Sequence, residues 1–95
     1  MDRLPTRVDK SGEDFASRTE HNLSLITKLS EKMEIARGGG GGKYVERHES
    51  RGKGMPRDRI SEICDSGTPF LELSTLAAYE MYDGRAHSAG IVTGI

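Results

Sequence analysis

The last six residues of the chain, Gly90–Ile95, form a mostly apolar run with the pattern of a buried strand. A buried strand needs neighbours, because its backbone N–H and C=O groups have no water to bind. The only other segment with clear strand alternation is Phe70–Ser74, which follows a cluster of turn residues. A sheet of two strands is marginal in water. We therefore expect both strands to belong to a larger folded body.

Three helices are expected before the strands. Residues 13–37 carry apolar side chains at steps of three and four, which is typical of an amphipathic helix: Leu25, Ile26, Leu29, Met33 and Ala36. Residues 43–50 are expected to form a short charged helix, and residues 56–64 a compact helix with Pro56 at its first position. Residues 76–82 mix helix formers with aromatic residues, so no element is assigned there.

Five consecutive glycines, Gly38–Gly42, separate the long helix from the rest of the chain. Such a run predicts a flexible hinge. The alternative is a phosphate cradle, which requires a preceding strand and a Ser or Thr after its lysine, whereas Tyr44 follows Lys43 here. The predicted organisation is a flexible arm over residues 1–12, the helix over 13–37, the hinge over 38–42, and one domain beginning at residue 43.

Composition does not favour independent folding. Apolar residues make up only 34% of the chain, there is no Trp, and 12 residues are Gly. A chain of 95 residues already buries a smaller fraction of its surface than a larger one does. Ordering each glycine also costs more backbone entropy than ordering another residue. The sequence thus offers little from which to build a core.

The net charge of −1 argues against a general nucleic-acid binder. It conceals a basic island over residues 43–59, where six basic residues face three acidic ones. No segment is apolar enough to span a membrane, and residues 1–10 lack the apolar run of a secretory signal. Transit peptides avoid acidic residues, whereas this segment contains Asp2 and Asp9. Their presence favours the bacterial cytoplasm, with the mitochondrial matrix as the alternative.

From residue 40 onward the sequence resembles the carboxyltransferase (beta) subunits of biotin-dependent acyl-CoA carboxylases, most of all those acting on 3-methylcrotonyl-CoA. Six blocks carry the resemblance through their order and spacing: GGGKYVERHESRGK at 40–53, PRDRI at 56–60, DSGTPFLELS at 65–74, AAY at 77–79, MYDG at 81–84 and AGIVTGI at 89–95. The helix over residues 13–37 fits this family by its position alone. Gly54 departs from the family pattern, which has an apolar residue there.

The resemblance implies a crotonase-like α/β domain, in which a helical arm leads into the first strands of the catalytic sheet. It implies transfer of a carboxyl group from carboxybiotin, carried by a biotin-bearing alpha subunit, to an acyl-CoA of leucine degradation. A homo-oligomer of beta subunits is also implied. The family's oxyanion donors lie in later glycine-rich loops, so we expect this amino-terminal segment alone to be inactive. The resemblance implies no metal and no catalytic residue here.

Three basic residues are candidates for binding the phosphates of CoA: Arg51, Lys53 and Arg57. Arg51 and Lys53 lie in an expected loop, where ligand contacts tend to gather. The alternative is that the basic residues form a solvated helix face or pair with acids at neighbouring turns. His48 has no nucleophile or carboxylate at a useful spacing and is interpreted as a surface residue.

Two other functions are kept as hypotheses. The chain is alternatively a stand-alone helical interaction module that associates with a carboxylase complex. The other hypothesis is a CoA or nucleotide binder that uses the basic island by itself.

Overall fold

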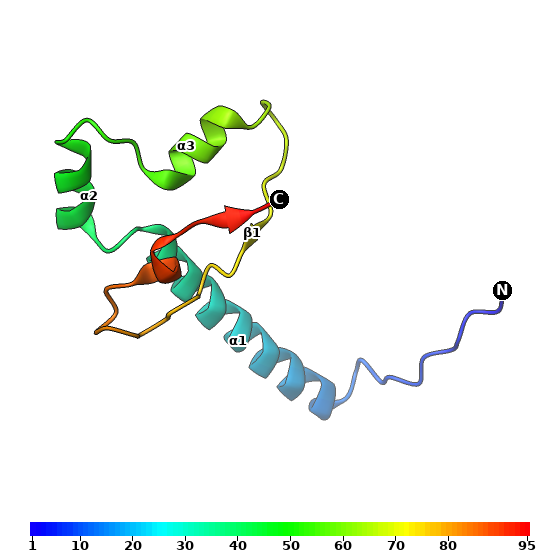
Figure 1. Ribbon diagram of the computed structural model, residues 1–95. Helices are drawn as coiled ribbons and strands as arrows, with labels where there is room; N and C mark the ends of the chain where they lie inside the picture. The colour runs from blue at the N-terminus through cyan, green and yellow to red at the C-terminus, as the bar shows by residue number, and fades with distance from the viewer. The chain divides into compact units, whose positions relative to one another are not determined.

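The computed structural model describes residues 1–95 and contains four helical segments and two short strands (Figure 1). In chain order these are α1 (Glu13–Arg37), α2 (Gly42–Glu49), α3 (Pro56–Ile63), β1 (Glu72–Leu73), the 3-10 turn η1 (His87–Gly90) and β2 (Thr93–Gly94). The bounds of α1 are those expected from the apolar spacing, and those of α2 and α3 differ from expectation by one residue. No helix has both the length and the apolar content needed to cross a bilayer.

The chain divides into two compact units, residues 1–30 and residues 31–95, and the division falls within α1. In the first unit the backbone turns just before the helix, where the Ser11 N–H and hydroxyl both donate to Asp9 Oδ1 at 2.9 and 2.6 Å. These bonds to Ser11 lower the pKa of Asp9. The helical part of this unit leaves its large apolar residues exposed: Leu23, Leu25, Ile26 and Leu29.

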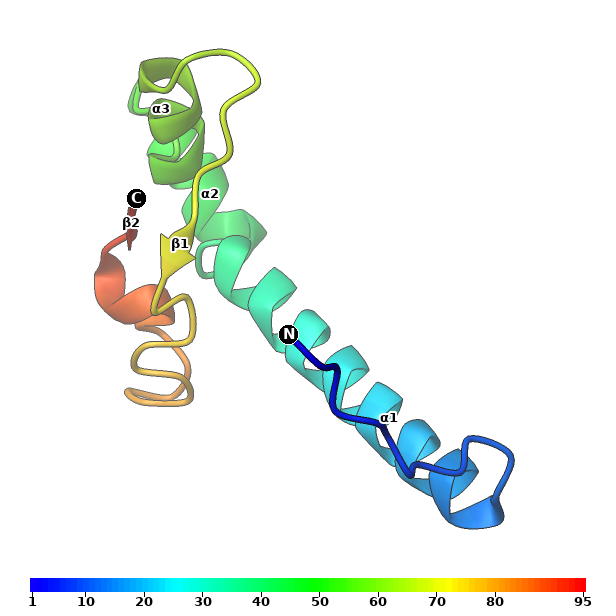
Figure 2. The same ribbon diagram turned by 90° about the vertical axis from the view of Figure 1, so that its right-hand side faces the viewer.

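In the second unit β1 and β2 pair antiparallel, with Glu72 opposite Gly94 and Leu73 opposite Thr93. Figure 2 shows the two strands side by side. The ladder continues by one step, because Leu71 and Ile95 exchange two backbone hydrogen bonds of 2.8 and 3.1 Å. Both strands are shorter than the sequence predicted. The expectation of a strand beginning at Gly90 was wrong, since that residue ends η1 with a φ of +75°.

The segment between the strands winds through successive turns (Figure 2). From residue 74 to residue 89, seven residues other than glycine adopt left-handed φ angles: Ser74, Ala78, Glu80, Tyr82, Asp83, Ser88 and Ala89. Such angles cost roughly 1–2 kcal/mol per residue, so contacts made elsewhere must compensate. One such contact is the bond from the Ala89 N–H to the Ala77 carbonyl, 3.0 Å long.

The buried interior is small and mostly polar. Ala36 is the single buried hydrophobic residue, and Thr75 and Ser88 are buried with it. The apolar residues around the two strands stay exposed instead: Leu71 is 59% exposed, Leu73 46% and Ile91 65%. The two-stranded sheet therefore has uncovered apolar surface.

Candidate functional site

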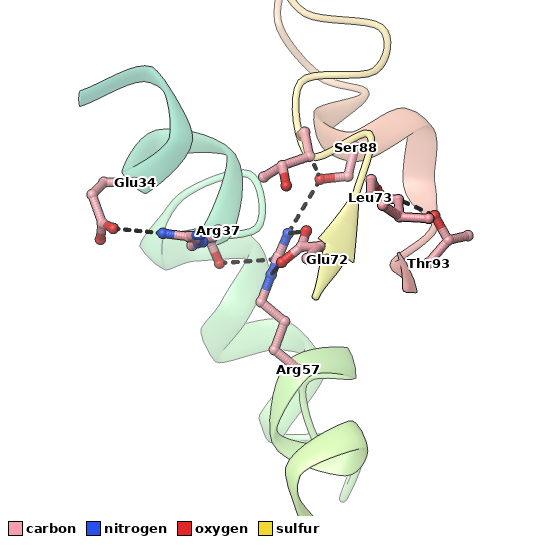
Figure 3. Close-up of polar contacts among 8 residues, drawn as sticks. Glu34, Arg37, Arg57, Glu72, Leu73, Ser88 and Thr93 are labelled. Carbon is pink, nitrogen blue, oxygen red and sulfur yellow. Dashed lines mark hydrogen bonds and ion pairs between the residues drawn. The ribbon is translucent and has the colours of Figure 1, made fainter. Parts of the chain in front are cut away.

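The most highly connected side chain of the second unit is Arg57 on α3 (Figure 3). Its Nε and Nη2 atoms donate to the two carboxylate oxygens of Glu72, at 3.0 and 2.6 Å. Nη2 also donates to the Ser88 hydroxyl at 3.2 Å, and Nη1 to the Arg37 carbonyl at 3.3 Å. A planar guanidinium fits a carboxylate in this two-pronged way better than an ammonium group does.

The pair between Arg57 and Glu72 is largely shielded from water, with side chains 26% and 10% exposed. Hydrogen bonding to Arg57 is the main cause that lowers the pKa of Glu72 below its ordinary value of 4.5, and partial burial opposes it. The ionised carboxylate is therefore the form that the folded unit favours.

This cluster ties together segments that are distant in sequence. Ser88, which accepts from Arg57, donates from its own hydroxyl to the Thr75 carbonyl at 2.9 Å. Together these bonds connect the end of α1, α3, β1 and the turn η1 (Figure 3). Lys32 adds a contact from α1, with its Nζ 4.8 Å from the centre of the Tyr79 ring. The cluster holds the fold of this unit in place.

Beside this cluster lies a pocket of about 550 Å³, which we call the α2 pocket. One face of α2 and the turn after it supplies a wall through side chains at helical spacing: Tyr44, Arg47, His48 and Arg51. Residues of the glycine run and of the segment before β2 complete it, including Gly39, Gly40, Arg85 and His87. No Asp or Glu is among the lining residues.

The basic residues of the α2 pocket differ in how far they are engaged. Arg57 lines it too, but Glu72 and other protein groups occupy its donors. Arg85 bonds to Asp83 at 3.0 Å. The guanidinium groups of Arg47 and Arg51 make no hydrogen bond or ion pair with the protein. Their N–H donors are therefore unpaired at the wall of the α2 pocket.

The three predicted phosphate ligands are thus distributed unevenly. Arg51 and Arg57 line the same pocket, whereas Lys53 is not among the residues lining it. His48, interpreted as a surface residue, is half-buried, and its Nε2 lies 3.1 Å from the Gly54 carbonyl oxygen. That contact joins α2 to the loop that leads to α3.

Sequence reasoning missed both the pairing of Glu72 and the place of Arg47 in the wall of a pocket. A signal existed for each. Glu72 is a lone acid in an otherwise apolar strand, and an acid that is shielded from water requires a partner. Arg47 shares its helical face with Tyr44 and Arg51, which lie three residues before it and four after it.

No protein-family model matches the chain. Among curated proteins, a mitochondrial methylcrotonoyl-CoA carboxylase beta chain of Arabidopsis thaliana is 40% identical over 97% of this chain, and a probable one of Drosophila melanogaster is 42% identical over 97%. A biotin-dependent 3-methylcrotonyl-coenzyme A carboxylase beta1 subunit of Mycobacterium tuberculosis is 43% identical over 83%.

The chain spans only 15 to 16% of the length of these relatives. The matches nevertheless reach beyond the blocks after residue 40 and take in 92 or 93 residues of the chain. The long helix, which fitted the resemblance by position alone, therefore lies largely within the homologous region. The resemblance indicated by the sequence motifs is confirmed.

Proposed function

We propose that this chain, a homologue of the beta chains of biotin-dependent acyl-CoA carboxylases, is part of a carboxyltransferase subunit. That subunit transfers a carboxyl group from carboxybiotin to 3-methylcrotonyl-CoA. The observation that carries the proposal is identity of about 40% over nearly the whole chain to methylcrotonoyl-CoA carboxylase beta chains. A propionyl-CoA carboxylase beta chain of Cereibacter sphaeroides is less similar, at 35% over 74% of the chain, which favours the branched substrate.

The uncovered strands support membership of a larger crotonase-like α/β domain. Exposed apolar side chains at Leu71, Leu73 and Ile91 have the character of surface that further sheet or helix would cover. In this proposal α1, α2 and α3 form the helical arm, and β1 and β2 are the first strands of the catalytic sheet.

The reaction requires an enolate beside the thioester carbonyl, and backbone N–H groups aimed at the developing oxyanion stabilise it. We assign those donors to other parts of the subunit, and carboxybiotin to a partner alpha subunit. A homo-oligomer of beta subunits completes the proposed assembly. The chain alone is then inactive.

Contacts to the phosphates of CoA were expected at Arg51, Lys53 and Arg57, and the structure gives each a different position. Arg51 offers open donors at a pocket, and Lys53 lies outside that pocket. Arg57 stabilises the wall of the α2 pocket rather than donating to a ligand, because its Nε and Nη2 atoms are bonded to Glu72.

A chimera tests the proposal. Residues 1–95 replace the matching segment of the Arabidopsis relative, and the chimera is assembled with its biotin-bearing subunit. Carboxylation of 3-methylcrotonyl-CoA is expected, and the 95-residue chain mixed with the same partner should give none. A chimera that assembles but carboxylates no acyl-CoA would count against the function. Turnover by the chain alone would contradict the assignment of the oxyanion donors.

A further inference from the structure

We propose that residues 40–54, which we call the flap, form a hinged lid that opens and closes over the α2 pocket. The flap contains α2 and the turn that follows it. The rest of the second unit, residues 31–39 and 55–95, is fixed and is called the body. The motion is a property of the segment itself, so it is independent of the proposed function and of what the pocket binds.

The two ends of the flap lie next to each other. A Cβ atom at Gly39 would lie 2.9 Å from Met55 Cε, so the Met55 side chain covers Gly39 at the point where the chain enters and leaves the flap. Two residues outside this contact on each side, Arg57 Nη1 donates to the Arg37 carbonyl at 3.3 Å. Glu72 holds the same guanidinium. The flap is therefore a closed loop that emerges from a fixed neck.

No hydrogen bond or ion pair joins the flap to the body. The bonds that its residues make stay within it, including the contact of 3.1 Å between His48 Nε2 and the Gly54 carbonyl oxygen. No residue of α2 is buried, and Tyr44 on its pocket face is 56% exposed. A segment with so few buried contacts opens at small cost in free energy. Because the His48 contact connects α2 to the loop after it, the flap moves as one piece.

Glycines stand at both ends of the flap. Gly40 and Gly41 have φ angles of +89° and +94°, and Gly52 has a φ of +72°. Cβ atoms at Gly41 and Gly52 would have no neighbour within 4 Å, so no packing restrains the backbone there. Glycine takes positive and negative φ angles about equally readily. Such positions can absorb the large changes in φ and ψ that a lid hinge requires.

The wall of the α2 pocket that belongs to the body is held in place. It includes Ser88, which is buried and bonded both to Arg57 and to the Thr75 carbonyl. A mobile wall beside a fixed one makes the pocket, with its volume of about 550 Å³, adjustable. Lids of this kind admit a ligand when open and exclude water when closed.

Double electron–electron resonance measures the motion on the 95-residue chain, with Cys64→Ser as background. One pair of spin labels joins the flap to the body through Glu46→Cys on α2 and Glu62→Cys on α3, both exposed positions. The control pair joins two parts of the body through Glu31→Cys on α1 and Glu62→Cys. The distance distribution of the flap pair should be at least about twice as wide as that of the control pair, because a lid shifts as a whole element.

Two substitutions that the backbone accepts should remove most of this difference. Gly42 is the first residue of α2, its N–H makes no backbone hydrogen bond, and the ψ of 163° at Gly41 suits a following proline. Gly42→Pro therefore fits, and Gly52→Asn keeps a positive φ that Asn tolerates. Together they should narrow the flap distribution to within about 1.5-fold of the control width. Gly67→Asn, at a positive φ with open space in the body, is the matched control and should leave the width unchanged.

Four outcomes would overturn the lid. The first is a flap distribution as narrow as that of the control pair. The second is a control pair as broad as the flap pair, since the flap would then have no fixed body to move against. The third is an unchanged width in the variant with both Gly42→Pro and Gly52→Asn, which would place the hinges elsewhere. The fourth is α2 amide exchange as fast as in residues 1–9, because a moving helix should exchange at least about tenfold more slowly than unfolded chain.

Discussion

Arg57 and Arg47 come from the same basic island, ten residues apart, yet the fold uses them in opposite ways. Arg57 is one-quarter exposed, with its donors bonded to Glu72, Ser88 and the Arg37 carbonyl. Arg47 is exposed and has no protein partner for its guanidinium. The comparison teaches that a basic cluster in a sequence is not one functional surface. An arginine has a structural role only where the fold places an acid next to its guanidinium group.

The acid comes from β1, fifteen residues after Arg57. The antiparallel pairing of β1 with β2 sets the position of Glu72 and brings the buried Ser88 to the same guanidinium. No comparable acid approaches the face of α2 that carries Arg47. Four predictions follow from this contrast, in order of decreasing effect.

Glu72→Ala should have the largest effect, because it leaves a largely shielded guanidinium without its charge partner. We expect a loss of roughly 2 kcal/mol in the free energy of unfolding. The measurement is urea unfolding followed by circular dichroism. Glu62→Ala is the matched control, since Glu62 on α3 is exposed and has no ion-pair partner. Equal loss in both variants would show that the ion pair of Glu72 with Arg57 stabilises the fold no more than an unpaired, exposed acid does.

Gly94→Ala should disturb the same cluster indirectly. A Cβ atom at this position would overlap the Phe70 ring and the Leu71 carbonyl oxygen. The strands would have to separate, which displaces Glu72, at a cost of about 1–2 kcal/mol. Gly42→Ala serves as control, because a Cβ there has no neighbour within 4 Å. The urea midpoints of the two variants decide the matter, and an unchanged midpoint for Gly94→Ala would contradict the pairing.

Acid should weaken the Arg57 pair reversibly. The folded pKa of Glu72 lies below its ordinary value of 4.5, so the stabilisation is complete above that pH and is lost as the pH falls through the folded pKa. The loss is expected to be smaller than that of Glu72→Ala, since a neutral carboxyl group still accepts a hydrogen bond. Unfolding at about pH 6 and about pH 3 measures it, and Glu72→Gln should reduce the difference. An undiminished difference in Glu72→Gln would assign the pH dependence to other carboxylates.

Arg47→Ala should have the smallest effect on stability, within about 0.5 kcal/mol, because an exposed guanidinium without a partner contributes little to folding. Chemical unfolding compares it with Arg57→Ala, for which a clear loss is expected. A destabilisation of Arg47→Ala equal to that of Arg57→Ala would mean that Arg47 also makes a structural contact.

Local patterns were enough for the helices, because their hydrogen bonds join residues four apart and depend on nearby side chains. The steps of three and four placed α1, and Pro56 placed the start of α3. The strands were predicted in the right regions but too long, since a strand extends only as far as a partner pairs with it. Residues 76–82 gave no local signal, and the structure has turns there.

The candidate site divides in the same way. The basic island was visible in the sequence, and so was the resemblance to carboxylase beta chains, because both are properties of residue order. The bonds of Arg57 to Glu72 were not visible in the sequence. Nor was it visible that the guanidinium groups of Arg47 and Arg51 have no protein partner. The sequence by itself determined which segments are helical, where charge accumulates and which proteins are its relatives. Only the tertiary structure decided which arginine meets an acid, since that contact requires β1 to fold back onto α3.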